Sequence, residues 1–108
     1  MSDGGEDDTG DQLALVLSDR ATVELNEAVA SYETERSGLG LAFLAAVDAV
    51  HALLRRHPQI GAEVRPRIRR ALLRRFPYGV FYVINERHIR VLAIIHSHRH
   101  PARWPRRA

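Results

Sequence analysis

Apolar residues along the chain shift from a short continuous run to helical spacing, and later to strand-like alternation. The five apolar residues at 13–17 have the length of a strand that is buried on both sides. Between residues 18 and 36, apolar positions recur every three or four residues. Ser18 and Asp19 supply the N-cap and the first-turn acid that helices prefer. The pattern therefore predicts a strand followed by an amphipathic helix that ends near Arg36.

A second helix is predicted from Leu39 to His57. The sequence Ser37-Gly38-Leu39-Gly40 is a compact break between two helical patterns, so the two helices should form an antiparallel hairpin. Two arginines at 55 and 56 suit the negative end of the helix dipole, and Pro58 stops the helix. Residues 57–66 hold two prolines and a glycine, which predicts a loop.

Three strand patterns follow, over residues 67–76, 78–85 and 88–96. In the last of them, Ile89, Val91, Ala93 and Ile95 are expected to share one face. The connections are short, which implies antiparallel pairing. The sequence thus predicts an α+β domain of order β-α-α-β-β-β, with a helical hairpin packed on a mainly antiparallel four-stranded sheet.

A chain of 108 residues is expected to form one domain and can bury a core without disulfides. Residues 1–12 contain five acids, three glycines and no apolar side chain except Met1. This composition predicts a disordered acidic leader. The folded domain is expected at residues 13–104, followed by a basic tail at 105–108.

The charge is distributed unevenly along the chain. All 16 basic side chains are arginine, and beyond residue 12 they face only eight acids, which gives this part a net charge of +8 against +3 for the whole. The guanidinium fork suits carboxylates and phosphates, although genomic base composition also explains the lack of lysine. The chain has no cysteine, which is compatible with a reducing cytoplasm, and it has no signal peptide or membrane-length apolar run.

The stretch from Arg69 to Tyr82, RRALLRRFPYGVFY, concentrates the positive charge. Side chains alternate along a strand, so Arg69 and Arg75 are expected on one face and Arg70 and Arg74 on the other. One interpretation is a surface that binds an anion, either RNA or an acidic partner protein. The structural alternative is a strand edge protected by charge. The number of arginines favours a binding surface.

Three histidines, His96, His98 and His100, have a spacing of two, so an extended backbone would point all of them the same way. Zinc is one option for such a set, but no acid lies nearby and no fourth ligand follows, so we predict no metal and no cofactor. A histidine at a strand end could instead act as a general base or contact phosphate, and the plain alternative is a surface histidine. If the domain cleaves RNA, it should do so without a metal ion. The ribose 2′-hydroxyl would then be the nucleophile, arginines would stabilise the added charge on the phosphoryl group, and His or Tyr would move protons.

Three segments resemble the RelE/ParE superfamily, the toxins of type II toxin–antitoxin modules. They are YETERSGLGLAFLAAVDAVHALLRRHPQIG, IRRALLRRFPYGVFYVI and IRVLAIIHSHRHPARW, within a match from Leu13 to Trp104. The most specific pieces are Gly38-Leu39-Gly40 with Phe43, RALLRRFPY at 70–78, and His96 with Arg99, Pro101 and Trp104. The superfamily also has the β-α-α-β-β-β order.

The resemblance implies one of two activities. ParE-like members bind and poison DNA gyrase without catalysis, whereas RelE-like members are metal-free, ribosome-dependent mRNA endonucleases. In the best-known RelE-like branch a tyrosine follows a C-terminal arginine. Here Arg99 matches that arginine, but the aromatic residue after it is Trp104, which has no ionisable hydroxyl. This departure favours the ParE-like branch, and a non-toxic relic that only binds antitoxin is a third option.

The resemblance also implies partners and site residues. A cognate antitoxin is expected, with a DNA-binding N-terminal half and an acidic or amphipathic C-terminal segment; the target would be gyrase, or alternatively the ribosome and mRNA, and no membrane is involved. The expected partner-binding residues are Arg69, Arg70, Arg74, Arg75, Arg99, Arg103 and Trp104. For the endonuclease alternative, the expected catalytic residues are Arg69, Arg75, Tyr78, His96 and Arg99.

Overall fold

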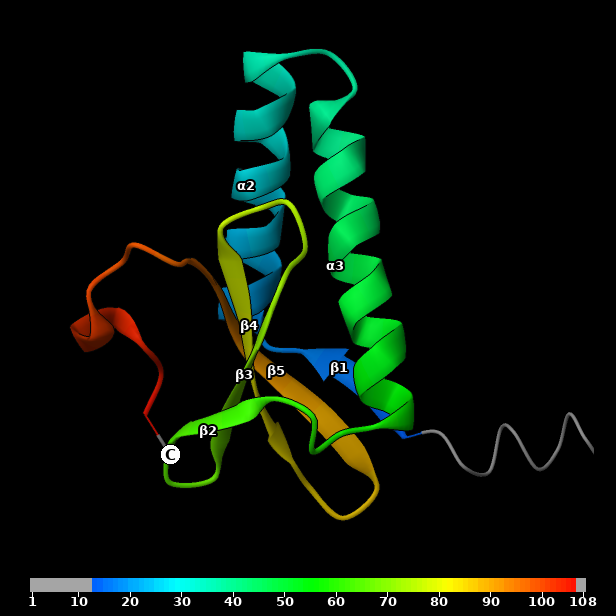
Figure 1. Cartoon of the computed structure of the whole chain (residues 1–108), viewed down its shortest axis with the longest axis vertical. Helices are drawn as coiled ribbons and strands as arrows, with labels where there is room; N and C mark the ends of the chain where they lie inside the picture. Colours follow the sequence, from blue (N-terminus) through cyan, green and yellow to red (C-terminus); the bar gives the residue numbers. More distant parts are fainter. Residues whose placement is uncertain (1–12, 107–108) are drawn as a thin grey trace, which may run out of the picture.

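The computed structural model describes residues 13–106 (Figure 1). The predicted acidic leader at 1–12 and the last two residues of the predicted basic tail lie outside the described residues. In chain order the elements are β1 (Ala14–Leu17), α2 (Asp19–Glu35), α3 (Leu39–Arg56), β2 (Ala62–Arg65), β3 (Ile68–Leu72), β4 (Tyr78–Ile84), β5 (His88–His96) and the short 3-10 helix η1 (Pro101–Arg103).

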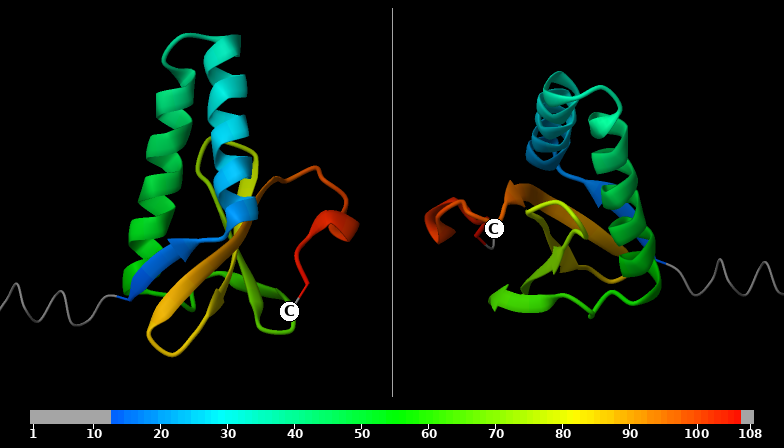
Figure 2. Two further views of the ribbon diagram at one scale, coloured as in Figure 1. Left: turned by 180° about the vertical axis from the view of Figure 1, so that it is seen from behind. Right: turned by 45° about the horizontal axis from the view of Figure 1, so that its top comes forward.

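The strands form one five-stranded sheet in the order β1-β5-β4-β3-β2. β1 runs parallel to β5, and all other neighbours are antiparallel. The α2–α3 hairpin lies against one face of the sheet and projects beyond the strands (Figures 1 and 2). The predicted α+β class and helical hairpin are confirmed, but the predicted number of four strands is wrong. Pro58 and Pro66 flank β2 rather than interrupt it, so a strand forms inside the segment predicted to be a loop.

A β-bulge in β5 changes which side chains reach the core. Phe81 pairs with Ala93 but Tyr82 pairs with Val91, so Leu92 is an extra residue without a partner on β4. Ile89 and Val91 join the core under the helices together with Ile94, whereas Ala93 lies on the opposite face. The prediction that positions 89, 91, 93 and 95 share one face is therefore wrong, because a bulge reverses the alternation beyond it.

β1 is an edge strand and not a strand buried on both sides. Leu15 and Leu17 turn toward the helices and are half-buried, while Ala14 is exposed and Val16 is 44% exposed. The expectation of two-sided burial is wrong because the helices cover only one face and β1 lies at the end of the sheet.

The helices begin and end where the local signals predict. Ser18 Oγ accepts a hydrogen bond from the Ala21 N–H at 3.0 Å, and α2 ends at Glu35 beside the expected Arg36. Neither helix of the part described is long and apolar enough to cross a membrane. The main core lies between the hairpin and the sheet, and its largest fully buried members are Tyr82, Phe43, Leu54, Ile89 and Ile94.

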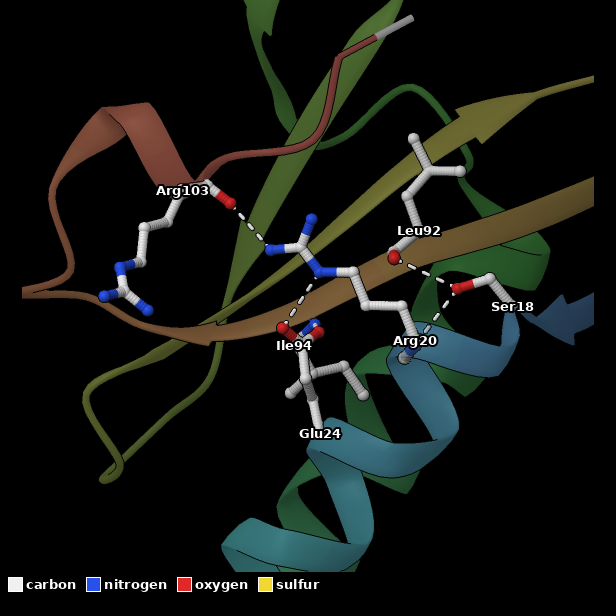
Figure 3. A network of polar contacts seen from close by, with 7 residues as sticks. Ser18, Arg20, Glu24, Leu92, Ile94 and Arg103 are labelled. Carbon is white, nitrogen blue, oxygen red and sulfur yellow. Dashed lines mark hydrogen bonds and ion pairs between the residues drawn. The ribbon is translucent and has the colours of Figure 1, made fainter. Parts of the chain in front are cut away.

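The start of α2 also completes the edge of β5 where β1 stops (Figure 3). Ser18 Oγ donates to the Leu92 carbonyl at 3.0 Å, and Glu24 Oε1 accepts the Ile94 N–H at 2.9 Å. The other Glu24 oxygen pairs with Arg20 Nε at 3.0 Å. Backbone groups that would otherwise be open at the bulge are thus satisfied by side chains of the helix.

The opposite face of the sheet carries a smaller core of Ile68, Phe81, Ala93 and Ile95. Part of this face is covered by residues 97–106, here called the C-terminal arm. Trp104 in the arm packs against Phe81, with ring centroids 5.2 Å apart. Two arginines fasten the arm through its backbone. Arg65 Nη2 donates to the Pro101 carbonyl and Arg20 Nη2 to the Arg103 carbonyl, each at 2.6 Å.

Candidate functional site

The arginine-rich stretch is divided by a loop. β3 ends at Leu72, and Arg74 and Arg75 lie in the connection to β4, where Arg75 has a φ of 73°. The Leu73 N–H donates to the Tyr78 carbonyl at 2.9 Å and closes the loop. The expectation that a strand runs to Phe76, with Arg69 and Arg75 on one face, is therefore wrong, because the chain leaves the strand before it reaches the second arginine pair.

Arg74 and Arg75 instead form one wall of a groove beside the α2–α3 hairpin, here called the basic groove. Its volume is ≈ 700 Å³. Its lining residues are Arg36, Leu39, Ala42, Ala45, Ala46, Arg74, Arg75 and Phe76. The floor is apolar, because α3 presents alanines there and Phe76 packs under the loop. The groove thus combines an apolar floor with three cations and no acid.

No described residue of the chain neutralises the three arginines of the basic groove. Within residues 13–106 their side chains make no hydrogen bond or ion pair, and the single ion pair of this part joins Arg20 and Glu24. Such a combination of apolar surface and free guanidinium groups matches a partner that presents apolar side chains beside carboxylates.

Arg69 and Arg70 are occupied in the fold. Arg69 Nη1 donates to the carbonyls of Gln59 at 3.0 Å and Gly61 at 2.6 Å, which fixes the segment before β2. The aliphatic part of the Arg70 side chain packs over Gly79 of the neighbouring strand β4. The contact is so close that a Cβ added at Gly79 would lie 3.0 Å from Arg70 Cγ. Neither arginine lines the basic groove, so the predicted partner-binding set is distributed over several surfaces.

The C-terminal arm places the remaining predicted partner-binding residues. The guanidinium carbons of Arg70 and Arg65 lie 5.0 and 5.8 Å from the centroid of the Trp104 ring. The exposed side chain of Arg103 points away from Arg20, although its carbonyl accepts a bond from it (Figure 3). Trp104 thus holds the arm on the sheet, while Arg103 faces solvent.

Three of the five residues expected for the endonuclease alternative meet in a second, polar cleft of ≈ 270 Å³. Its lining includes Tyr78, His96 and Arg99, together with Glu24 and Glu27. The Tyr78 and His96 rings are 5.3 Å apart in an edge-to-face arrangement. Burial raises the pKa of Tyr78, which Glu24 reinforces and Arg99 opposes. Tyr78 is therefore a neutral hydroxyl near pH 7.

The His96 imidazole is held by the chain that follows it. The His98 N–H donates to His96 Nδ1 at 3.1 Å, so in the neutral ring the proton is on Nε2. The cleft can therefore offer hydrogen-bond donors from Tyr78 and His96 beside the Arg99 charge. Two carboxylates share this cleft, and Arg69 and Arg75 lie elsewhere, so it is a weaker match for a polyanion than the basic groove.

The three closely spaced histidines do not line up along one extended strand: the rings of His96 and His98 are 5.0 Å apart, whereas His100 caps the short helix η1. β5 ends at His96, and the chain turns where Ser97 donates to the Pro77 carbonyl at 2.6 Å. His100 Nδ1 accepts the Ala102 N–H at 3.1 Å as the N-cap of η1. Residues 13–106 contain no group of three His, Cys, Asp or Glu side chains able to hold a metal ion.

One arginine of the basic groove, Arg36, is absent from the predicted site. Arg36 lies immediately after α2 in the sequence, where it looks like the end of a helix and nothing more. Only the packing of the hairpin beside the β3–β4 loop brings it to Arg74 and Arg75. Its signal in the sequence is its position next to the Ser37–Gly40 break, which fixes where the two helices turn.

Comparisons with known proteins agree with this architecture. The family model of the ParE toxin of the type II toxin–antitoxin system, parDE, matches residues 15–101. Among solved structures, the chromosomal ParDE toxin–antitoxin system from P. aeruginosa is similar in fold, with a TM-score of 0.60 and 18% identity over 79% of this chain and 96% of that chain. No curated protein sequence matches the chain significantly. The resemblance to the RelE/ParE superfamily is confirmed, and the chain belongs to the ParE toxin family of type II toxin–antitoxin systems.

Proposed function

We propose that this protein is a growth-inhibiting toxin that a cognate antitoxin neutralises by binding in the basic groove, and that the free toxin binds DNA gyrase. The observation that carries the antitoxin half is the groove itself, in which three arginines that pair with no side chain of residues 13–106 surround an apolar floor. An acidic amphipathic segment would place apolar side chains on Ala42, Ala46 and Phe76 and carboxylates on the arginines. The proposal places the protein in the cytoplasm, where gyrase acts on DNA.

Family membership supports the pairing with an antitoxin. The similar structure from P. aeruginosa is described as a ParDE system, in which toxin and antitoxin occur together. The net charge of +8 beyond residue 12 adds long-range attraction toward an acidic partner, which raises the rate of encounter. An antitoxin segment that folds as it binds would cover surface over a large area.

The antitoxin half is tested with the product of the reading frame adjacent to this gene, co-expressed with the toxin. The triple variant Arg36→Glu, Arg74→Glu, Arg75→Glu should lose co-purification of the antitoxin. A matched triple, Arg67→Glu, Arg87→Glu, Arg90→Glu, makes the same change of charge at exposed positions outside the groove and should retain it. Equal loss in both triples would mean that net charge, and not the groove, governs binding.

The gyrase half is tested with purified toxin and relaxed plasmid. Toxin should inhibit ATP-dependent supercoiling by gyrase, and addition of antitoxin should restore it. Unchanged supercoiling at micromolar toxin would reject gyrase as the target, whatever the result of the antitoxin experiment.

The second candidate is a metal-free endonuclease, which the meeting of Tyr78, His96 and Arg99 in one cleft favours. The ribose 2′-hydroxyl would pass its proton to Glu27, a carboxylate of the same cleft, or to water as it attacks the adjacent phosphate. The bond from phosphorus to the 5′ oxygen would break, with Arg99 stabilising the added charge and the Tyr78 hydroxyl protonating the leaving oxygen. Primer extension on translated mRNA should then reveal new cleavage sites that Arg99→Ala abolishes. Intact transcripts during growth arrest would reject this candidate and leave the gyrase proposal standing.

A further inference from the structure

The outer side of α3 presents a continuous track between two arginine clusters. At one end lies the basic groove with Arg36, Arg74 and Arg75. At the other end lies a groove of ≈ 400 Å³, here called the α3 end groove, which is lined by Ala49, Ala52, Leu53, Arg55, Arg56 and His57. The helix has 18 residues, so the two ends are about 27 Å apart.

The track is apolar and exposed along its length. Ala42, Ala45, Ala49 and Ala52 are exposed, and Leu53 is 43% exposed. Arg56 makes no side-chain hydrogen bond or ion pair within residues 13–106, like the three arginines of the basic groove. A segment lying along this side of α3 would therefore meet positive charge at both ends. Between the ends it would cover apolar surface, whose dehydration costs little free energy.

The first described residue of the chain, Leu13, lies beside this track. The Leu13 N–H donates to the Arg55 carbonyl at 3.1 Å, and Arg55 Nε donates to the Leu13 carbonyl at 3.0 Å. Residues 1–12 are thus tethered at the α3 end groove. They contain Asp3, Glu6, Asp7, Asp8 and Asp11 and no basic side chain.

Length and charge spacing fit the track. Twelve residues reach at most about 40 Å, which exceeds the length of α3. Asp11 is two residues from Leu13, so a leader bound along α3 would bring it within about 7 Å of Leu13, on the side of Arg55 and Arg56. Asp3 is ten residues away and can reach about 35 Å, far enough for the basic groove.

We propose that residues 1–12 bind along the outer side of α3, with Asp11 at the α3 end groove and the acids near Asp3 at the basic groove. The tether gives the segment a millimolar effective concentration at this surface. Apart from Met1 the segment has no apolar side chain, so it neutralises the arginines without filling the alanine floor. It is therefore a displaceable occupant, which an amphipathic antitoxin segment would replace.

Amide chemical shifts of the full-length protein test the contact. A variant with an uncharged leader, Asp3→Asn, Glu6→Gln, Asp7→Asn, Asp8→Asn, Asp11→Asn, should differ from the wild type at residues 49–57 and at Arg36 and residues 74–76. Those differences should vanish in about 1 M salt, where the screening length is near 3 Å. Differences confined to residues 13–15, or to the β4–β5 turn at Arg87–Arg90, would overturn the proposal.

Spin labels test the direction of the segment, because the chain has no native cysteine. Ser2→Cys and Thr9→Cys keep all five acids. A label at position 9 should broaden amides at residues 49–57, and a label at position 2 should broaden residues 42–46 and 74–76. Identical broadening by both labels, or none along α3, would overturn the proposed placement.

The regulatory consequence rests on the proposed function. If the antitoxin uses the basic groove, the uncharged-leader variant should bind it about three- to tenfold more tightly than the wild type, because an internal competitor has been removed. Failure of every variant to bind antitoxin would reject the proposed function, while the shift and broadening patterns still decide the contact. Unchanged affinity in a variant that has lost the contact would reject competition by the leader.

Discussion

The carboxylate of Glu33 caps the N-terminus of α3 by accepting a hydrogen bond from the backbone N–H of Gly40. Its Oε1 accepts the Gly40 N–H at 2.9 Å, and its Oε2 accepts the Gly38 N–H at 2.9 Å. Gly38 is the N-cap of α3, has a φ of 89° and offers no side chain, so an acid near the end of α2 supplies the missing acceptor. These bonds lower the pKa of Glu33, that from Gly38 most strongly. The tight turn of the hairpin, and with it the position of Arg36, depends on this contact.

Gly40→Ala should destabilise the protein although alanine is the better helix former. A Cβ at this position would lie 2.6 Å from the Val29 carbonyl oxygen, which is backbone and cannot turn away. Separating the helices should cost about 1–3 kcal/mol, more than the roughly 1 kcal/mol gained in helix propensity. Urea unfolding followed by circular dichroism measures the difference.

Gly38 provides the matched control, because no atom lies within 4 Å of a Cβ built there. Gly38→Ala should lose stability through its positive φ alone, and Gly38→Asn should recover part of it, since asparagine tolerates this conformation. Asparagine at position 40 should recover nothing. A Gly40→Ala protein as stable as the wild type would show that the helices can move apart freely.

Ser18→Ala should destabilise the protein by about 1–2 kcal/mol. The Ser18 hydroxyl both accepts a hydrogen bond from the Ala21 N–H and donates one to the Leu92 carbonyl, at 3.0 Å each. Its loss therefore leaves an N–H at the start of α2 and a carbonyl at the β5 bulge without partners. Ser18→Asp keeps the acceptor but cannot donate to the carbonyl, so its stability should fall between those of the wild type and Ser18→Ala. Equal stability of the aspartate variant and the wild type would mean that the bond to Leu92 contributes nothing.

The helices follow from the sequence because their determinants are local. Ser18, the glycine-containing break and Pro58 act within a few residues, and each helix begins or ends there. The sheet is less predictable, because β2 pairs only after the chain returns to β3, and the bulge at Leu92 depends on which strand is its neighbour. The exposure of Val16 likewise follows from strand order and not from its own apolar run.

The candidate site is likewise predictable only where it depends on local sequence. The sequence indicates arginines near residue 74, but their alternation suggests a strand that continues to Phe76. The structure ends the strand at Leu72, so Arg74 and Arg75 join Arg36 from another element, while Arg69 turns to the carbonyls of Gln59 and Gly61. Which arginines are free and which are structural depends on tertiary contacts that residue spacing does not contain.

Tyr82→Phe should reduce the free energy of unfolding by about 1–3 kcal/mol. The buried Tyr82 hydroxyl accepts the Gly61 N–H at 3.0 Å and donates to the Pro58 carbonyl at 2.6 Å, and it thereby fixes the segment before β2. Tyr32→Phe is the control, since the Tyr32 hydroxyl makes no hydrogen bond within residues 13–106 and the change should stay within about 0.5 kcal/mol. Equal effects of the two changes would contradict a structural role for the Tyr82 hydroxyl.

The protein should lose stability on acidification partly through His51. Burial lowers the pKa of His51 below its usual 6.5, against the opposing effect of Asp48. Below pH 6.5 the unfolded chain therefore binds a proton that the folded protein does not, and the free energy of unfolding falls until the pH reaches the folded pKa. His51→Leu should flatten this part of the stability profile, and Asp48→Asn should steepen it. Parallel profiles between pH 7.5 and 5.5 in all three proteins would exclude His51 as the source.

The only tryptophan of the chain reports how the C-terminal arm is held. Trp104 packs against Phe81, and the Arg70 guanidinium carbon lies 5.0 Å from the centroid of its ring. Arg70→Ala removes this cation–π contact, worth about 0.5–1 kcal/mol, and should make the fluorescence of Trp104 more accessible to acrylamide. Arg74→Ala removes the same charge from the exposed loop and should leave quenching unchanged. Equal quenching in the two variants would mean that Phe81 and Arg65 hold the ring without Arg70, so that the arm would stay on the sheet when Arg70 is replaced.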